Sequence, residues 1–110
     1  MLKFDNRFLR LLPGESHSSN QSRQVHGAFW SRVTPTPVAA PQLIAYSSEV
    51  ASMLGVSDAE MRAPEMIAAL SGNGVLPGME TYATVYGGHQ FGNWAGQLGD
   101  GRAILLGEAV

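Results

Sequence analysis

The sequence predicts an α+β fold in which helices near residues 47–71 are followed by an antiparallel β-hairpin near residues 94–108. Helix signals gather in the middle of the chain, where Ser47 and Ser57 can each cap the start of a helix. Strand signals come after them, since runs of aromatic, β-branched and aliphatic residues alternate there with glycine-rich turns. Ten of the 13 glycines lie in the last 39 residues, which places most of the tight turns at this end of the chain.

Length and composition exclude several classes of protein. With 110 residues the chain has room for one small domain, and its net charge of −2 comes without the cluster of basic residues that binds nucleic acid. Cysteine is absent, so a disulfide framework and a thiolate metal site are excluded within these residues. No apolar run approaches the roughly 20 residues of a membrane span, and the first residues lack the pattern of a secretory signal. We therefore expect a cytoplasmic protein with neither nucleic acid nor membrane as a partner.

The N-terminal third shows little regular structure in its pattern. Residues 1–12 mix apolar and basic side chains, which indicates a first core-packing segment or, alternatively, an arm that docks on another part of the protein. A proline–glycine turn ends this segment, a polar loop follows over residues 15–24, and residues 25–33 form a short buried segment. Three prolines within residues 34–41 exclude a helix or a central strand there. This stretch is interpreted as a rigid connector, with a polyproline ligand for a partner as the alternative.

Capping signals divide residues 47–71 into three short helices. Gly55 supplies a left-handed stop after the first of them. Ser57 and Glu60 have the spacing of a capping box, in which each side chain accepts a hydrogen bond from the backbone N–H of the other residue. Pro64 would break that second helix but suits the first turn of a third. The apolar side chains predicted to face the core are Val50, Met53, Leu54, Met61, Met66, Ile67 and Leu70.

The dipeptide Asp100-Gly101 gives the hairpin signal. Asp-Gly between two strand-like runs is typical of a type I′ turn, because that turn needs positive φ at both central residues. Residues 94–98 and 102–108 are therefore predicted to pair as antiparallel strands. A further strand is predicted over residues 82–86, which are rich in tyrosine and β-branched side chains.

Gly99, Gly101 and Arg102 are the candidate ligand-binding residues. A glycine turn without side-chain bulk lets backbone N–H groups approach phosphate oxygens, and the arginine adds a planar charged fork that suits phosphate. The alternative is an ordinary hairpin that binds nothing, because the turn matches neither a P-loop nor a dinucleotide-binding fingerprint.

His89, which lies among glycines, is the other residue with chemical potential. It could act as a base, a metal ligand or a phosphate donor, or it could be a structural histidine that donates to a loop backbone. The other histidines give no ligand spacing, so no metal site is predicted. Asp100 and Glu108 do not form an acid–base couple, and no nucleophile with an activating base is visible. The residues by themselves therefore predict a phosphate-binding turn and no catalytic residue.

Two motifs near the end of the chain occur in a specific order, with GHQFG at residues 88–92 and QLGDGR at residues 97–102. The run over residues 85–108, which contains both motifs, resembles the selenoprotein O family, which is called YdiU in bacteria, and so do FDNRF at residues 4–8 and residues 33–41 and 71–73. The resemblance spans nearly the whole chain in sequence order.

This resemblance implies a protein-kinase-like (pseudokinase) fold, of which residues 1–110 would form an N-terminal extension and the beginning of the N-lobe, a single incomplete domain. It implies transfer of AMP from ATP to the Ser, Thr or Tyr hydroxyls of protein substrates, with Mg or Mn as the metal. Gly99, Gly101 and Arg102 then correspond to nucleotide contacts of the family.

The resemblance also implies that a nucleotide-binding lysine, a catalytic aspartate and metal-binding Asn and Asp residues lie downstream of Val110. The isolated chain is accordingly expected to be catalytically inactive and marginally stable. The alternative is a non-catalytic truncated module that binds a nucleotide or a partner.

Overall fold

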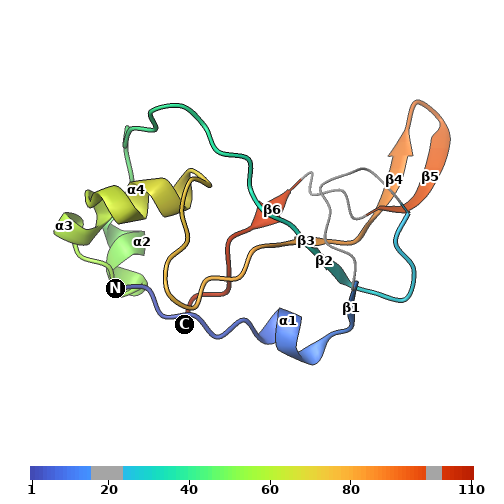
Figure 1. Cartoon of the computed structure of the whole chain (residues 1–110), viewed down its shortest axis with the longest axis horizontal. Coiled ribbons are helices and arrows are strands. Elements are labelled where there is room, and N and C mark those ends of the chain that lie inside the picture. The colour runs from blue at the N-terminus through green and yellow to red at the C-terminus, as the bar shows by residue number, and fades with distance from the viewer. Residues whose placement is uncertain (16–23, 99–102) are drawn as a thin grey trace.

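The helices between residues 47 and 71 lie at one end of the long axis of the molecule, and the sheets lie toward the other end (Figure 1). The computed structural model describes residues 1–15, 24–98 and 103–110. The helices are α1 (Arg7–Leu11), α2 (Ser48–Met53), α3 (Asp58–Met61) and α4 (Pro64–Leu70). The strands are β1 (Gly14–Glu15), β2 (Trp30–Arg32), β3 (Tyr82–Thr84), β4 (Tyr86–Gln90), β5 (Asn93–Leu98) and β6 (Ile104–Leu105).

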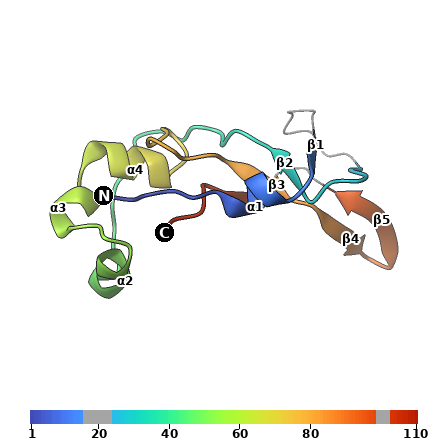
Figure 2. The same ribbon diagram turned by 90° about the horizontal axis from the view of Figure 1, so that it is seen from below.

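The molecule is elongated, measuring 45 × 31 × 23 Å, with a radius of gyration of 15.7 Å. A compact domain of this length would have a radius of gyration of about 13 Å. Figure 2 shows the helical end and the β4–β5 hairpin at opposite extremes of the molecule. Within the described ranges, the longest helix, α4, has seven residues, so none of these helices is long enough to cross a membrane.

The three predicted helices between residues 47 and 71 are confirmed, together with their caps. The Ser47 hydroxyl accepts a hydrogen bond from the Val50 backbone N–H at 3.3 Å. In the capping box, the Glu60 N–H donates to the Ser57 hydroxyl at 3.1 Å, and the Ser57 N–H donates to the Glu60 carboxylate at 3.4 Å. Pro64 begins α4, where its missing N–H leaves no helical bond unmade. Each of these contacts is local, which explains why the sequence predicts them.

The apolar face predicted for the first of these helices is wrong. Met53 is 84% exposed and Val50 is 53% exposed, so these side chains point into solvent. The helix turns Ala51 inward instead, and Ala51 forms a small core with Val56 and Met66. A six-residue helix packs through less than two turns, so one small residue against α3 and α4 is enough to fix its orientation.

A four-stranded sheet of order β1-β2-β3-β6 lies between the helical end and the β4–β5 hairpin (Figure 1). β1 and β2 are parallel, whereas β2 with β3 and β3 with β6 are antiparallel. The central strand positions are fully enclosed, with Ser31 at 0% and Ala83 at 1% exposure. Because a buried hydroxyl needs a hydrogen-bond partner, the Ser31 hydroxyl donates to the Glu15 carboxylate at 2.6 Å. The strand predicted over residues 82–86 is therefore confirmed in its first three residues.

The pairing predicted for the hairpin near residues 94–108 differs from the observed pairing. β5 pairs with β4 in a separate two-stranded sheet, and β6 pairs with β3. The turn that makes the β4–β5 hairpin is Phe91-Gly92, whose φ angles of 52° and 76° are both positive, as a type I′ turn requires. The hairpin is therefore closed by the glycine turn before β5, whereas the predicted turn residues Gly99, Asp100 and Gly101 lie outside the described residues. The helices and antiparallel strands agree with the predicted α+β class.

The proline-containing segment 34–41 has neither helix nor strand, as predicted. The side chain of Asn73 holds it against the helical end. The Val38 N–H donates to Asn73 Oδ1 at 2.7 Å, and Asn73 Nδ2 donates to the Val38 carbonyl at 2.7 Å. Most of the predicted polar loop falls in residues 16–23, which lie outside the described residues.

Candidate functional site

The predicted nucleotide contacts Gly99, Gly101 and Arg102 lie outside the described residues. The structure does describe the strands on either side of them. β5 ends at Leu98 and β6 begins at Ile104, so the turn connects two different sheets. The described geometry near these residues is therefore that of the two flanking strands.

The incoming strand, β5, is held from outside its hairpin by residues 24 and 25. Gln24 forms an isolated antiparallel bridge with Leu98, the last residue before the turn. The Val25 N–H donates to the Gln97 carbonyl at 2.7 Å, and the Val25 side chain is 1% exposed. A buried apolar anchor and a short backbone bond thus fix the strand immediately before the predicted phosphate-binding turn.

The outgoing strand, β6, is held by β3. Ile104 pairs with Ala83 and Leu105 pairs with Tyr82. Tyr82 is 2% exposed, and its ring stacks on Phe8 of α1 with the ring centroids 5.6 Å apart. Burial, together with the nearby negative charge of Glu108, raises the pKa of the Tyr82 phenol. Among the described residues this ladder has two residue pairs, Tyr82 with Leu105 and Ala83 with Ile104.

Glycines in the stretch before the turn make room for side chains of the neighbouring strand. A Cβ atom at Gly87 would lie 2.7 Å from the ring of Trp94, and one at Gly88 would lie 2.5 Å from Leu98 Cδ1. The sequence predicted a tightly folded or closely approached backbone here, and the structure confirms a close approach. The approaching groups are the cross-strand side chains of β5.

His89 lies on β4, exposed to solvent and opposite Trp94. Among the described residues its side chain makes no hydrogen bond, so donation from the imidazole to a loop backbone, one of the expected roles, is not seen. No three His, Asp or Glu side chains within the ranges 1–15, 24–98 and 103–110 are grouped so as to hold a metal ion.

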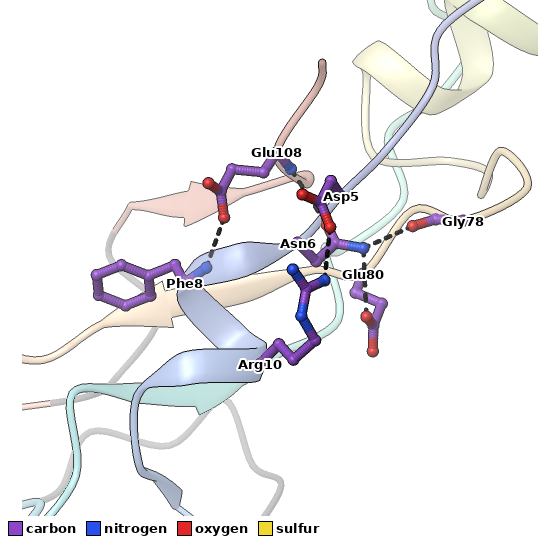
Figure 3. A network of polar contacts seen from close by, with 7 residues as sticks. All are labelled: Asp5, Asn6, Phe8, Arg10, Gly78, Glu80 and Glu108. Carbon is purple, nitrogen blue, oxygen red and sulfur yellow. Dashed lines mark hydrogen bonds and ion pairs between the residues drawn. The ribbon is translucent and has the colours of Figure 1, made fainter.

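Sequence reasoning missed a polar cluster that joins the two ends of the chain. Its central pair, here called the N-terminal clamp, is Asn6 and Glu108 (Figure 3). Asn6 Oδ1 accepts from the Glu108 N–H at 3.1 Å, and the Glu108 carboxylate accepts from the Phe8 N–H at 2.7 Å. These residues are about 100 positions apart, so no local pattern indicates them. The available signal was that both belong to stretches that carry the family resemblance.

A cavity of about 370 Å³ opens beside the clamp. Two ion pairs line it: Arg10 with Asp5 at 2.5 Å, and Arg32 with Glu80 at 3.2 Å. The hydrogen bond from the Arg10 guanidinium lowers the pKa of the Asp5 carboxyl below its ordinary value. The four charges offset one another, so this cavity has no excess charge with which to attract a phosphate.

Comparison with known proteins decides the family. A sequence model described as "Protein adenylyltransferase SelO" matches residues 15–110. The chain belongs to the SelO family. The resemblance found in the sequence motifs is therefore confirmed. The match includes the whole of the predicted phosphate-binding turn and both strands that flank it.

Two curated SelO relatives illustrate the similarity, and each is named protein nucleotidyltransferase YdiU. The one from Tolumonas auensis is 68% identical over 109 residues, which cover 99% of this chain and 21% of the relative. The one from Methylobacillus flagellatus is 64% identical over 110 residues, which cover 100% of this chain and 21% of the relative. The chain thus spans about a fifth of the length of these curated relatives. Unlike the family model, both alignments are long enough to include the N-terminal clamp.

Proposed function

We propose that this chain is the N-terminal portion of a protein adenylyltransferase that transfers AMP from ATP to Ser, Thr or Tyr hydroxyls of protein substrates. The observation that carries the proposal is the family match over residues 15–110, supported by relatives named protein nucleotidyltransferases. In the reaction a substrate hydroxyl oxygen bonds to the α-phosphorus of ATP. The bond from that phosphorus to the bridging oxygen breaks, pyrophosphate leaves, and the hydroxyl proton passes to a base.

The contribution proposed for this chain is one wall of the nucleotide site, made by Gly99, Gly101 and Arg102. The backbone N–H groups of the two glycines would bind phosphate oxygens, since no side chain obstructs their approach. The Arg102 guanidinium would add two parallel charge-assisted hydrogen bonds to the same phosphate. Support comes from the two strands beside the turn, β5 and β6, each of which is held by a separate segment of the chain.

The groups that carry out the chemistry are proposed to lie in the remaining length of the relatives, within a protein-kinase-like fold. They comprise the lysine that binds the nucleotide, the base, and the ligands of Mg or Mn. The metal would neutralise charge on the phosphates, and the described residues of this chain include no group of ligands for it. The proposal therefore assigns phosphate positioning to this chain and no catalytic residue.

A chimera tests this function directly. Residues 1–110 replace the matching segment of the Tolumonas auensis relative, to which they are 68% identical. ATP labelled at the α-phosphorus should transfer its label to protein, whereas ATP labelled at the γ-phosphorus should not. Transfer of the γ label would indicate phosphorylation and contradict the proposal. Absence of labelling by the chimera, where the parent relative labels protein, would favour a non-catalytic nucleotide-binding or interaction module.

The isolated 110-residue chain should give no label in the same assay. Label transfer by the isolated chain would refute the assignment of the chemistry to the rest of the protein.

Arg102→Ala in the chimera tests the turn itself. A hydrogen bond to a charged group contributes about 1.5–3 kcal/mol, so the substitution should weaken ATP binding roughly 10- to 100-fold in calorimetric titration. The matched control is Arg62→Ala, which removes the same side chain from the helical end, where it lies 5.9 Å from the ring of Tyr46. Equal affinities for the two variants would show that the turn does not bind the nucleotide through Arg102.

A further inference from the structure

We propose that the outer side of α2 is a docking surface for the part of a SelO-family protein that lies outside residues 1–110. The surface, here called the α2 face, consists of Val50 and Met53 of α2 and of Leu54, which caps the end of this helix. The inference rests on the family membership and on the structure of the helical end. It does not depend on the chemistry proposed above.

The α2 face has the spacing of a buried helix side but is exposed. Residues three and four positions apart lie on the same side of a helix, so the spacing of these three apolar side chains predicts burial. Instead, the side chain of Met53 is 84% exposed, that of Val50 is 53% exposed and that of Leu54 is 40% exposed. Figure 2 shows α2 at the edge of the helical end, and the helix packs there through Ala51. Among the described residues, α2 thus has an apolar side without a cover.

The other sides of α2 have a different composition. Ser48 and Ser52 lie on the opposite side of the helix, and Glu49, its charged residue, lies between the two sides. The exposed apolar side chains are therefore gathered on one side of α2 rather than scattered over it. Single exposed apolar residues are ordinary, whereas a gathered apolar patch marks an interaction site.

The length of the relatives identifies the occupant. This chain covers 21% of the Tolumonas auensis relative and 21% of the Methylobacillus flagellatus relative, so most of each relative lies outside the matched region. A segment joined to the same chain is present at an effective concentration of about millimolar, which favours it over a separate partner. The apolar character of the α2 face also suits a permanent contact, because permanent interfaces are more hydrophobic than transient ones.

Residue 110 lies close to the α2 face. The Val110 N–H donates to the Lys3 carbonyl at 3.0 Å. Two residues earlier, the Met1 amino group donates to the Gly55 carbonyl at 2.6 Å, directly after Leu54. Figure 1 shows both termini beside the helical end. A chain that continues from residue 110 therefore starts near the α2 face and needs only a short connection to cover it.

Methionine oxidation measures whether the α2 face is covered. The chimera with the Tolumonas auensis relative is treated with hydrogen peroxide, and mass spectrometry follows the sulfoxide at each methionine of residues 1–110. Each rate is compared with that of the same methionine in the urea-unfolded chimera. Met53 should react about tenfold more slowly in the folded chimera, although residues 1–110 by themselves leave it 84% exposed. Met66 and Met79, which are 5% and 7% exposed, report whether this segment is folded.

Two lysine substitutions on opposite sides of α2 locate the contact. Val50→Lys places a charge in the α2 face, and Ser52→Lys places the same charge on the opposite side, at a position that is also exposed within residues 1–110. Burying an unpaired charge in an apolar interface is strongly unfavourable, so Val50→Lys should separate the α2 face from its cover. Oxidation of Met53 should then rise to within about twofold of the unfolded rate. Ser52→Lys should keep the protection of the unsubstituted chimera.

The possible occupants give different results. Oxidation of Met53 at the unfolded rate, in a chimera that protects Met66 and Met79, would overturn the proposal and leave the α2 face to a separate partner. Protection that disappears when the protein is diluted to a monomer, as measured by sedimentation, would overturn it in favour of a second copy. Equal protection of Met53 in Val50→Lys and Ser52→Lys would also overturn it, because the cover would then lie elsewhere.

A second host keeps the proposal falsifiable if the first chimera does not fold. Where Met66 and Met79 are unprotected, the same three proteins are compared with the Methylobacillus flagellatus relative as the host, to which the chain is 64% identical. Met53 that reacts at the unfolded rate in both hosts overturns the proposal. Failure of either chimera to transfer AMP would count against the proposed function alone, since the oxidation of Met53 reports docking and not chemistry.

Discussion

Substitution of Gly107 by alanine should destabilise the chain more than the same change at any glycine with free space around it. Gly107 has a φ of 150°, a conformation that residues with a side chain rarely adopt. A Cβ atom there would lie 2.8 Å and 2.9 Å from two ring carbons of Phe4, and 3.3 Å from Asn6 Oδ1. The added methyl group would therefore push the N-terminal segment away from the end of the chain.

The magnitude follows from three contributions. The backbone conformation costs about 1–3 kcal/mol for a residue with a Cβ atom. Overpacking against the Phe4 ring costs about 1–3 kcal/mol. Alanine reduces the freedom of the unfolded chain relative to glycine, which offsets about 0.4–1 kcal/mol. With the middle of each range, the net loss in the free energy of unfolding should be about 3 kcal/mol.

Urea unfolding followed by far-ultraviolet circular dichroism measures this loss. With a slope of about 1–2 kcal/mol per molar urea, the midpoint for Gly107→Ala should fall by about 1–3 M. The control is Gly55→Ala, because Gly55 also has a positive φ, 72°, but a methyl group added there would have no atom within 4 Å. It should lose only about 1 kcal/mol. If Gly107→Ala is no less stable than Gly55→Ala, the close packing of the N-terminal segment is refuted.

Two other predictions concern stability. The raised pKa of Tyr82 means that the folded state favours the neutral phenol. The contribution of this phenol to the free energy of unfolding is therefore fully present below pH 10 and is lost as the pH rises above it. Thermal unfolding between about pH 8 and pH 11 should show this alkaline loss, and Tyr82→Phe should reduce it; an identical pH dependence in both proteins would exclude the cause. Ser57→Ala should lower the free energy of unfolding by about 1 kcal/mol through loss of the capping box. The exposed Ser52→Ala should be close to neutral in the same urea assay, and equal losses would argue against the cap.

The helical end of the molecule could be predicted because its decisive contacts are local. The hydroxyls of Ser47 and Ser57 each bind a backbone N–H three residues later. Gly55 takes the left-handed conformation that ends the first helix. Such contacts depend on residue type and spacing alone, and they form in the same way whatever surrounds the helix. The exposure of the Met53 side chain could not be predicted from local contacts, because the neighbours of a short helix decide which of its faces is buried.

The strand pairing could not be predicted from local signals, because these signals favour the turn after β5, whereas the observed hairpin uses the turn before it. Asp100-Gly101 suits a two-residue hairpin by residue type, whereas Phe91 takes the positive φ of the observed turn although a bulky residue rarely does. The choice between them depends on partners that are distant in the sequence. Gln24 pairs with the end of β5, and β3 takes β6 as its neighbour. The candidate turn can be recognised from its composition. The residues that hold its flanking strands cannot be recognised in this way, because they are distant in the sequence.

These supports come from the same part of the chain on both sides of the turn. Residues 24 and 25 hold the strand that enters it, through the bond from Val25 to the Gln97 carbonyl. Asn6 holds the chain that leaves it, through Glu108. The first quarter of the sequence therefore contacts the described residues on both sides of the predicted turn. We accordingly expect that removal of residues 1–25 would lower the free energy of unfolding, because both of these attachments would be lost. An unchanged midpoint in urea unfolding would contradict this expectation.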